Sequence, residues 1–318
     1  MSNNTPNEFY GKEYKSPEFT QKIDDYRKKI DDYMRNLIKE LVLDVKLKEG
    51  MEYALFNGGK RIRPILTLGV YEMIESFNKK AEKNAEDTEN ASKDADENDD
   101  INIDITPALP FAAAVEMVHV ASLIQDDLPC MDDDDERRGK PSLHVKYNES
   151  SAILASDSLI CLAFEAIVSN QDFNPYKVLE AARTLSFGFG ANGVQSGQML
   201  DLNTKLTTVD DYNALNLKKT ATLIMTACLF GAILAGANMD EYTNIGEFGK
   251  NLGLAFQLKD DLLDFDTDEN NLAILLGKKD SQELLDKYTE EAKFNIHKFG
   301  ESSFFLQDLS NYLLNRDI

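Results

Sequence analysis

The sequence has few cysteines, and none of them is spaced as in a metal or redox motif. Its 318 residues contain only Cys130, Cys161 and Cys228, and no two of these form a CxxC pair. An odd number of scattered cysteines does not make a disulfide framework, so we expect a reducing compartment. The N-terminus lacks the apolar stretch typical of a signal peptide, and the cytoplasm is therefore the expected location.

Positive charge is also scarce. Lysine and arginine total 34, against 56 aspartate and glutamate residues, which gives a formal net charge of −22. A surface this acidic argues against a general binder of the nucleic-acid backbone, so no nucleic-acid partner is expected. Because basic residues are a minority, the places where they gather carry information about function.

Uncharged hydrophobic runs are scarce as well, with one exception at residues 220–239. This stretch, TATLIMTACLFGAILAGANM, has no charge and is about as long as the twenty residues that cross a bilayer. Threonines interrupt it, and the small residues Gly231 and Gly236 suit close packing of helices. We interpret the stretch as a buried core helix and expect no transmembrane segment.

Strand-like alternation is absent over any useful length, whereas helical spacing of apolar residues is common. Ser16 and Pro17 form a start signal, and apolar residues then recur at helical spacing as far as Tyr33. Further helices are predicted at residues 61–77, 107–128, 151–168, 175–202, 209–237, 240–265 and 272–298, with a last one ending at Leu314. The sequence therefore predicts an all-α protein.

Residues 79–105 differ from the rest of the chain. They are acidic, rich in Asn, Asp, Glu and Ala, and show no apolar period. We interpret them as a disordered insertion between two helices. The many carboxylates also allow a calcium site, but the segment lacks the glycine turn and the ligand spacing of an EF-hand loop.

Two aspartate clusters stand out. The first lies in DDLPCMDDDD, where Pro129 prevents the helix from continuing, so that Asp132 can return over the end of the helix that carries Asp126. The second lies in FQLKDDLLDF, where Asp260 and Asp264 are one helical turn apart. Crowded carboxylates repel one another unless a cation neutralises them, and oxygen ligands favour magnesium.

The basic residues gather at three places between and before these clusters. They occur in GGKRIRP (residues 58–64), in RRGK (residues 137–140) and in KKT (residues 218–220). Arginine side chains match phosphate oxygens with two parallel hydrogen bonds, and paired glycines let a backbone approach a ligand closely. One such cluster could be ordinary surface charge. Three clusters that alternate with two aspartate clusters predict a site for magnesium and phosphate.

In this order, the motifs GGKRIRP, DDLPCMDDDDERRGKP, GQMLDL, KKT and FQLKDDLLDF resemble those of the isoprenyl diphosphate synthases that make farnesyl and geranylgeranyl diphosphate. The resemblance implies a single domain over residues 1–318, an all-α bundle around a deep central cavity, and a homodimer. It further implies that isopentenyl diphosphate condenses with an allylic diphosphate (dimethylallyl, geranyl or farnesyl), with three magnesium ions per active site.

The resemblance also assigns roles to individual residues. The metal ligands would be Asp126, Asp127, Asp132, Asp260, Asp261 and Asp264. The catalytic residues would be Asp126, Asp127, Arg137, Lys219 and Asp260. The allylic diphosphate would contact Arg137, Lys219, Thr220 and Gln257. Isopentenyl diphosphate would contact Lys60, Arg63, His119 and Arg138. Gln198 and Asp201 would lie in a segment that lines the cavity.

Product length is predicted from the helix that carries Asp126. A helix rises about 5.4 Å per turn, which is close to one extended isoprene unit, so side chains along one face can act as a ruler. Family members that stop at fifteen carbons often have a large aromatic residue five positions before the first aspartate. The residue here is Ala121, with Ser122 and Val118 nearby. This favours geranylgeranyl diphosphate, with farnesyl diphosphate second, unless Ala121 merely fills a core gap.

The sequence departs from the family after Asp264. The following loop is shorter than in the family and acidic where lysines are expected, and we expect Lys278 and Lys279 to lie too far along the next helix to substitute. This leaves a catalytically weak regulatory subunit as an alternative. A terpene cyclase is disfavoured by the residues of the isopentenyl site, and a non-enzymatic calcium binder has only charge in its favour.

Overall fold

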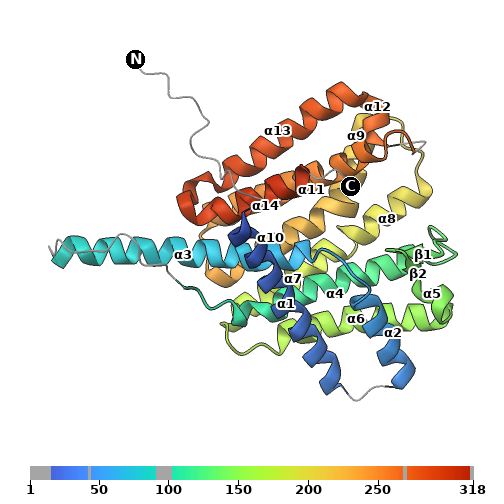
Figure 1. The fold of residues 1–318 in the computed structure, drawn as a ribbon, viewed down its shortest axis with the longest axis horizontal. Coiled ribbons are helices and arrows are strands. Elements are labelled where there is room, and N and C mark those ends of the chain that lie inside the picture. The colour runs from blue at the N-terminus through green and yellow to red at the C-terminus, as the bar shows by residue number, and fades with distance from the viewer. Residues whose placement is uncertain (1–15, 42–43, 91–101, 268–270, 316–318) are drawn as a thin grey trace.

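The computed structural model describes residues 16–41, 44–90, 102–267 and 271–315. These ranges are mostly helical, and the strands they contain form one short antiparallel hairpin of β1 (Glu136–Arg137) and β2 (Lys140–Pro141) (Figure 1). The all-α prediction is confirmed.

The first helix begins where the sequence predicted. The Ser16 hydroxyl accepts a hydrogen bond of 3.1 Å from the Phe19 amide and caps α1 (Pro17–Glu40). One stripe of this helix is buried, from Phe19 to Ile38. Helix α2 (Val45–Leu55) follows and packs against α6 (Glu149–Val168).

The core consists of helices that pack in pairs. Helix α4 (Leu109–Asp126) packs along α6, while α10 (Thr222–Ala235) lies against both α3 (Ile62–Asn90) and α11 (Met239–Leu263). A Cβ atom on Gly231 would lie 2.6 Å from the Thr67 carbonyl oxygen of α3, so only glycine permits this approach. Gly236 has a different role from the one predicted, because it ends α10 with a φ of +75°.

Most of the stretch at residues 220–239 forms a core helix, as expected, with α10 covering Thr222–Ala235. Every residue of α10 except Met225 is buried in the protein. By length and composition, the described stretches Thr106–Asp126, Glu149–Val168 and Val209–Ala235 could each cross a membrane. Their most apolar windows are 78%, 44% and 72% buried, respectively.

Two predicted helices are each divided in two by glycines. The stretch predicted at residues 175–202 forms α7 (Pro175–Phe189) and α8 (Val194–Asn203), with Gly190 and Gly193 between them. The stretch predicted at residues 272–298 is divided at Gly277, whose φ of +82° separates α12 (Leu272–Leu276) from α13 (Lys278–Ile296). A 3₁₀ segment (His297–Ser303) then leads into α14 (Phe304–Leu314).

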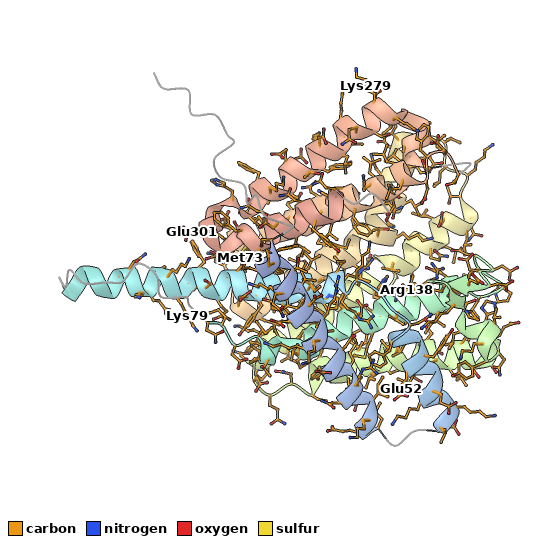
Figure 2. The ribbon with its side chains drawn as sticks, in the orientation of Figure 1. Glu52, Met73, Lys79, Arg138, Lys279 and Glu301 are labelled. Carbon is orange, nitrogen blue, oxygen red and sulfur yellow. The ribbon has the colours of Figure 1, made fainter. Side chains whose placement is uncertain are left out.

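The prediction of disorder from residue 79 to residue 105 was wrong at both ends. Helix α3 continues to Asn90 and extends beyond the bundle, with Lys79 on the extending part (Figures 1 and 2). Its alanines, lysines and glutamates favour helix even without an apolar period. At the other end, Ile103 and Ile105 are buried in the core. Residues 91–101 lie outside the described part of the chain.

Candidate active site

The first aspartate cluster lies at the C-terminal end of α4. Asp126 is the last residue of this helix, and the chain then turns so that the Asp132 amide donates a 2.9 Å hydrogen bond to the Asp126 carbonyl oxygen. This is the return over the helix end that Pro129 led us to expect. Burial raises the pKa of Asp126 to about 6, and Asp132 adds to the rise while Lys219 opposes it.

Asp127 is the buried member of this cluster, at 4% exposed. Its carboxylate accepts hydrogen bonds from two nitrogens of Arg137, and the Nε contact measures 2.8 Å. The Arg137 guanidinium also pairs with Asp134 at 3.0 Å. The hairpin of β1 and β2 therefore holds Arg137 against the helix end, beside the position where the predicted metal ions would lie.

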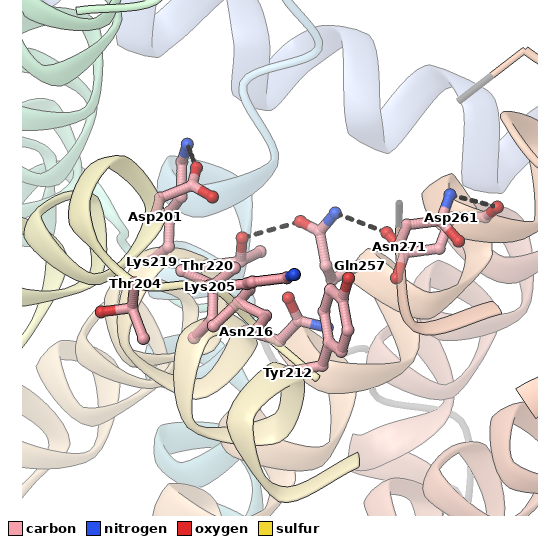
Figure 3. A pocket seen from close by; sticks show the side chains of 12 residues that line it. Asp201, Thr204, Lys205, Tyr212, Asn216, Lys219, Thr220, Gln257, Asp261 and Asn271 are labelled. Carbon is pink, nitrogen blue, oxygen red and sulfur yellow. Dashed lines mark hydrogen bonds and ion pairs between the residues drawn. The ribbon is translucent and has the colours of Figure 1, made fainter. Parts of the chain in front are cut away.

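The second cluster lies at the C-terminal end of α11, and its members differ in environment. Asp261 is buried and accepts hydrogen bonds from the Gln257 side chain at 3.0 Å and from the Leu272 amide at 3.3 Å. The Thr220 hydroxyl donates to Gln257 at 2.8 Å, which joins this cluster to the residues around Lys219 (Figure 3). Asp260 is partly exposed and Asp264 is exposed.

The KKT motif lies in a π-helical turn (Leu217–Ala221) between α9 (Val209–Asn216) and α10. Lys219 forms an ion pair with Asp201 of α8, and Lys218 donates to the Ser196 hydroxyl at 2.9 Å. A Cβ atom on Gly197 would lie 2.6 Å from the Lys219 Cα atom, so glycine is required for this contact. The GQMLDL motif therefore positions the KKT motif.

Gln198 and Asp201 extend this arrangement towards the first cluster. Gln198 donates a 3.4 Å hydrogen bond to the Asp132 carboxylate, while Asp201 pairs with Lys219. A cavity of about 460 Å³ opens beside them. The residues that line it are Asp201, Thr204, Lys205, Leu206, Tyr212, Leu215, Asn216, Lys219, Thr220, Gln257, Asp261 and Asn271 (Figure 3).

The residues predicted to bind isopentenyl diphosphate line a second cavity of about 630 Å³. They are Lys60, Arg63, His119 and Arg138. Phe256 lines this cavity and the adjacent Gln257 lines the first one, so both cavities border α11. The structure thus brings together all four residues that the sequence assigned to this substrate.

Positive charge in the second cavity is not fully balanced by the protein. The buried Nε of Arg63 has no hydrogen-bond partner among the described residues, and burial lowers the pKa of this arginine to about 10. Burial also lowers the pKa of His119 well below its ordinary value, and Arg63 and Arg138 add to that effect. An anion in the cavity would satisfy Arg63 and would oppose the effect of the arginines on the pKa of His119.

Sequence reasoning missed the ion pairs that support this cavity. Arg61, 4% exposed, contacts Asp31 at 2.8 Å and the buried Glu116 at 3.0 Å. The sequence signal that could have predicted these ion pairs was Glu116, a lone charge inside the apolar run of α4. Gly58 and Gly59 have φ values of +98° and +119°, and they let Arg138 reach the Gly58 carbonyl oxygen. The glycine pair thus accommodates an arginine.

The short loop after Asp264 is only partly described, because residues 268–270 lie outside the described part of the chain. Lys278 approaches the residues at the start of this loop, since its amine lies 3.1 Å from Asp266 and over the ring of Phe265. It does not line the cavity, so the expectation that it cannot replace the missing lysines stays a prediction. Gly277 turns the chain back, which the sequence interpretation did not anticipate. Lys279 points elsewhere and pairs with Glu283 at 3.6 Å.

The residues predicted to set product length are inside the bundle. Val118 and Ala121 are fully buried and Ser122 is 7% exposed. The Ser156 hydroxyl of α6 donates to the Ala121 carbonyl oxygen at 3.1 Å, so this part of α4 faces α6. Residues other than these three line the two cavities described above, and the ruler stays a prediction.

The chemistry of the carboxylates suits magnesium. Asp126 has a raised pKa because its charge is poorly solvated and opposed by like charge, and a divalent cation would relieve both effects. Among the described residues, no three His, Cys, Asp or Glu side chains lie close enough together to form a metal site. The six-aspartate magnesium site is therefore still a prediction.

Comparison with known proteins indicates one family of enzymes. A family model described as polyprenyl synthetase matches residues 44–283. The farnesyl diphosphate synthase of Micrococcus luteus is 36% identical over 308 residues, covering 89% of this chain and 95% of the relative. The geranylgeranyl diphosphate synthase of Cyanophora paradoxa is 32% identical over 288 residues, covering 85% and 87%.

Solved structures agree with this result. The crystal structure of a geranyltransferase from Legionella pneumophila superposes with a TM-score of 0.81 at 30% identity, covering 94% of this chain and 98% of that one. An FPP/GFPP synthase from Zymomonas mobilis gives a TM-score of 0.79 at 29% identity, with 93% and 99% covered.

Proposed function

The chain belongs to the polyprenyl synthetase family and is a prenyltransferase, and from this premise we propose that it condenses isopentenyl diphosphate with allylic diphosphates in a magnesium-dependent reaction. One observation carries the assignment of substrates to sites. A cavity bordered by carboxylates and Lys219 and a cavity with unbalanced arginines both border α11, at the adjacent residues Gln257 and Phe256.

The allylic diphosphate is assigned to the 460 Å³ cavity. Asp126, Asp127, Asp132, Asp260, Asp261 and Asp264 would hold magnesium, which neutralises charge on the leaving diphosphate. Lys219 and Arg137 supply fixed positive charge beside the first cluster, and the hydrogen bond between Thr220 and Gln257 orients two side chains that line the cavity. These residues stabilise the diphosphate while the allylic carbon–oxygen bond breaks.

Isopentenyl diphosphate is assigned to the 630 Å³ cavity. Its diphosphate would satisfy the free Nε of Arg63 and contact Lys60 and Arg138. The double bond then attacks the allylic cation, a new carbon–carbon bond forms, and a proton leaves to the departing diphosphate. The apolar surface of α10 excludes water, which would convert the cation to an alcohol.

Geranylgeranyl diphosphate is the product that the side chains of α4 favour, with farnesyl diphosphate second. Ala121 is small and buried, at the position where family members that stop at fifteen carbons often have a large aromatic residue. The Ala121→Tyr variant should shift the main product towards fifteen carbons. An unchanged product distribution in an active variant would show that the chain does not pass Ala121.

A homodimer is part of the proposal. Helices α6 and α7 pack together and carry large apolar side chains in solvent, including Leu154 at 59% exposed and Leu179 at 67%. A second copy of the chain would cover this surface. The cytoplasmic location expected from the sequence also stays a proposal.

The test is incubation of the purified protein with isopentenyl diphosphate, magnesium and each allylic diphosphate in turn, followed by product chromatography. We expect a twenty-carbon product. The relatives named as synthases do not favour the regulatory-subunit alternative. No product with any allylic substrate would contradict the proposed function, and products only after mixing with another synthase would support the subunit.

A further inference from the structure

The 460 Å³ cavity contains a lysine to which neither the sequence motifs nor the resemblance assigned a role. Lys205 lies in the extended segment between α8 and α9 and lines the cavity together with Lys219, Gln257 and Asp261. In Figure 3 its side chain extends towards Tyr212 and Gln257, whereas the Lys219 amine points to Asp201. The two lysines thus line the same cavity from different elements.

Lys205 and Lys219 are the two cations among the residues that line this cavity, and they differ in pairing. Lys219 forms an ion pair with Asp201. The Lys205 side chain is exposed and forms no hydrogen bond or ion pair within the described part of the chain. Its charge is therefore available to a ligand.

The backbone on the C-terminal side of Lys205 is fixed. The Asp211 carboxylate accepts hydrogen bonds from the amides of Thr207 at 3.1 Å and Thr208 at 2.9 Å. The Thr208 hydroxyl in turn accepts a bond from the Asp211 amide, which completes a capping box at the start of α9. The long side chain can move, but its attachment point is held at the edge of the cavity.

The remaining wall on this side lacks positive charge. It is formed by Gln257, Asp261, Tyr212 and Asn271, which are neutral or acidic. A diphosphate at this wall would have little to balance its charge. Lys278 comes near the second cluster, but Asp266 already pairs with it and it does not line this cavity.

We propose that Lys205 binds the diphosphate of the allylic substrate in this cavity and supplies the positive charge that the short loop after Asp264 does not. The proposal rests on the proposed function. It makes Lys205 a substrate-binding residue that acts on affinity for the allylic substrate, whereas the residues at the end of α4 act on bond breaking. The charge-assisted hydrogen bond would form with a phosphate oxygen.

The test uses inorganic diphosphate with magnesium as the probe and isothermal titration calorimetry as the measurement. The Lys205→Ala variant should bind diphosphate about tenfold more weakly, which is about 1.4 kcal/mol. Its KM for the allylic substrate should rise by a similar factor, with kcat and the KM for isopentenyl diphosphate unchanged. Lys205→Arg should restore most of the affinity, because it keeps the charge.

Three further lysine variants make the result decisive. Lys279→Ala is the matched control, since Lys279 is exposed on α13 and should leave both measurements unchanged. Weaker binding in Lys278→Ala but not in Lys205→Ala would overturn the inference and assign the role to Lys278. Normal binding in Lys205→Ala and Lys278→Ala, with weaker binding in Lys219→Ala, would overturn the inference and leave the proposed function intact. Normal binding in the Lys205, Lys278 and Lys219 variants would contradict the proposed function itself.

Discussion

At the scale of single residues, the second cavity and the first aspartate cluster are unbalanced in opposite senses. Burial and Arg138 lower the pKa of Arg63, and burial and both arginines lower the pKa of His119, whereas burial and Asp132 raise the pKa of Asp126. Groups that oppose one another's charged form are stabilised when a ligand of opposite charge arrives. The proposed diphosphates and magnesium ions would balance these charges, and perturbed pKa values of this kind are frequent at functional sites.

The aspartates provide the first test at this scale. Asp126→Ala or Asp260→Ala should lower turnover at saturating magnesium by at least about a hundredfold, as the loss of one electrostatic stabiliser does. Steady-state rates with isopentenyl and allylic diphosphates measure the effect. Asp286→Ala is the control, because Asp286 is exposed on α13 and bonds to Gln282. Near-normal rates in both cluster variants would rule out the metal assignment.

His119 provides a test by pH. Its pKa is lowered by burial and by the arginines, so the unfolded chain binds the proton more readily than the folded one. Stability should therefore fall as the pH drops below about 6.5, the ordinary value for histidine. His119→Gln should lose part of this acid sensitivity, measured as the midpoint of thermal unfolding between pH 7 and pH 5. Identical pH profiles for the two proteins would contradict a buried neutral histidine.

The sequence was informative where several residues of the same charge occur together. Six aspartates and three basic groups predicted a site for cations and phosphate, because like charges placed next to apolar helices repel one another without a ligand of opposite charge. It could not identify Lys205 or Glu116, since each is a single charge whose meaning depends on what lies opposite in the fold. Lys205 lies across the cavity from a wall without positive charge, and Glu116 pairs with Arg61. In both cases the facing residues are distant in the chain.

At the scale of elements, the site depends on contacts between turns and helix ends. The π-helical turn that carries Lys219 and Thr220 lies against α8 at Gly197, and a wider turn of this kind is common at functional sites. Asp201 of α8 then pairs with Lys219. The position of α8 therefore controls the position of the lysine.

Gly197→Ala tests this coupling. The new Cβ atom would overlap the backbone of Lys219, so the turn must shift, and the KM for the allylic substrate should rise by about tenfold or more, the scale of one lost charged contact. Gly246→Ala is the matched control in α11, where the nearest atom would be an ordinary 3.6 Å from the new Cβ. That variant should keep its activity and gain up to about 1 kcal/mol of stability. Equal kinetics for the two variants would contradict the coupling.

Helix boundaries were predicted less well than helices. Hydrophobic spacing continues through Gly190, Gly193 and Gly277, so the sequence pattern alone does not show that the backbone changes direction there. The missed boundary at Gly277 also concerns the surroundings of the site, because the turn there brings Lys278 back to Asp266, just after the second aspartate cluster. The helical start at Ser16 was predicted correctly, since its signal is local and chemical.

At the scale of the whole molecule, the apolar exposed surface is uneven. Helices α6 and α7 carry exposed Leu154, Leu179 and Phe187, and the α6 stretch is only 44% buried in its most apolar window. Helix α13 lies on the opposite side of the bundle (Figure 1) and is mostly polar outside, with Phe294 as a single exposed aromatic. Isolated exposed apolar residues are ordinary, whereas a contiguous group indicates an interface.

The dimer prediction follows from this asymmetry. Replacing Leu154 and Leu179 together by glutamate buries two charges in the expected interface, so light scattering after size exclusion should report a monomer where the unaltered protein gives a dimer. Phe294→Glu is the control, because Phe294 is even more exposed, at 78%, but lies on the far side, so the change should leave the dimer intact. The named residues of both cavities come from one chain, so the monomeric variant should still bind inorganic diphosphate. A dimer that survives the double substitution would place the interface elsewhere on the molecule.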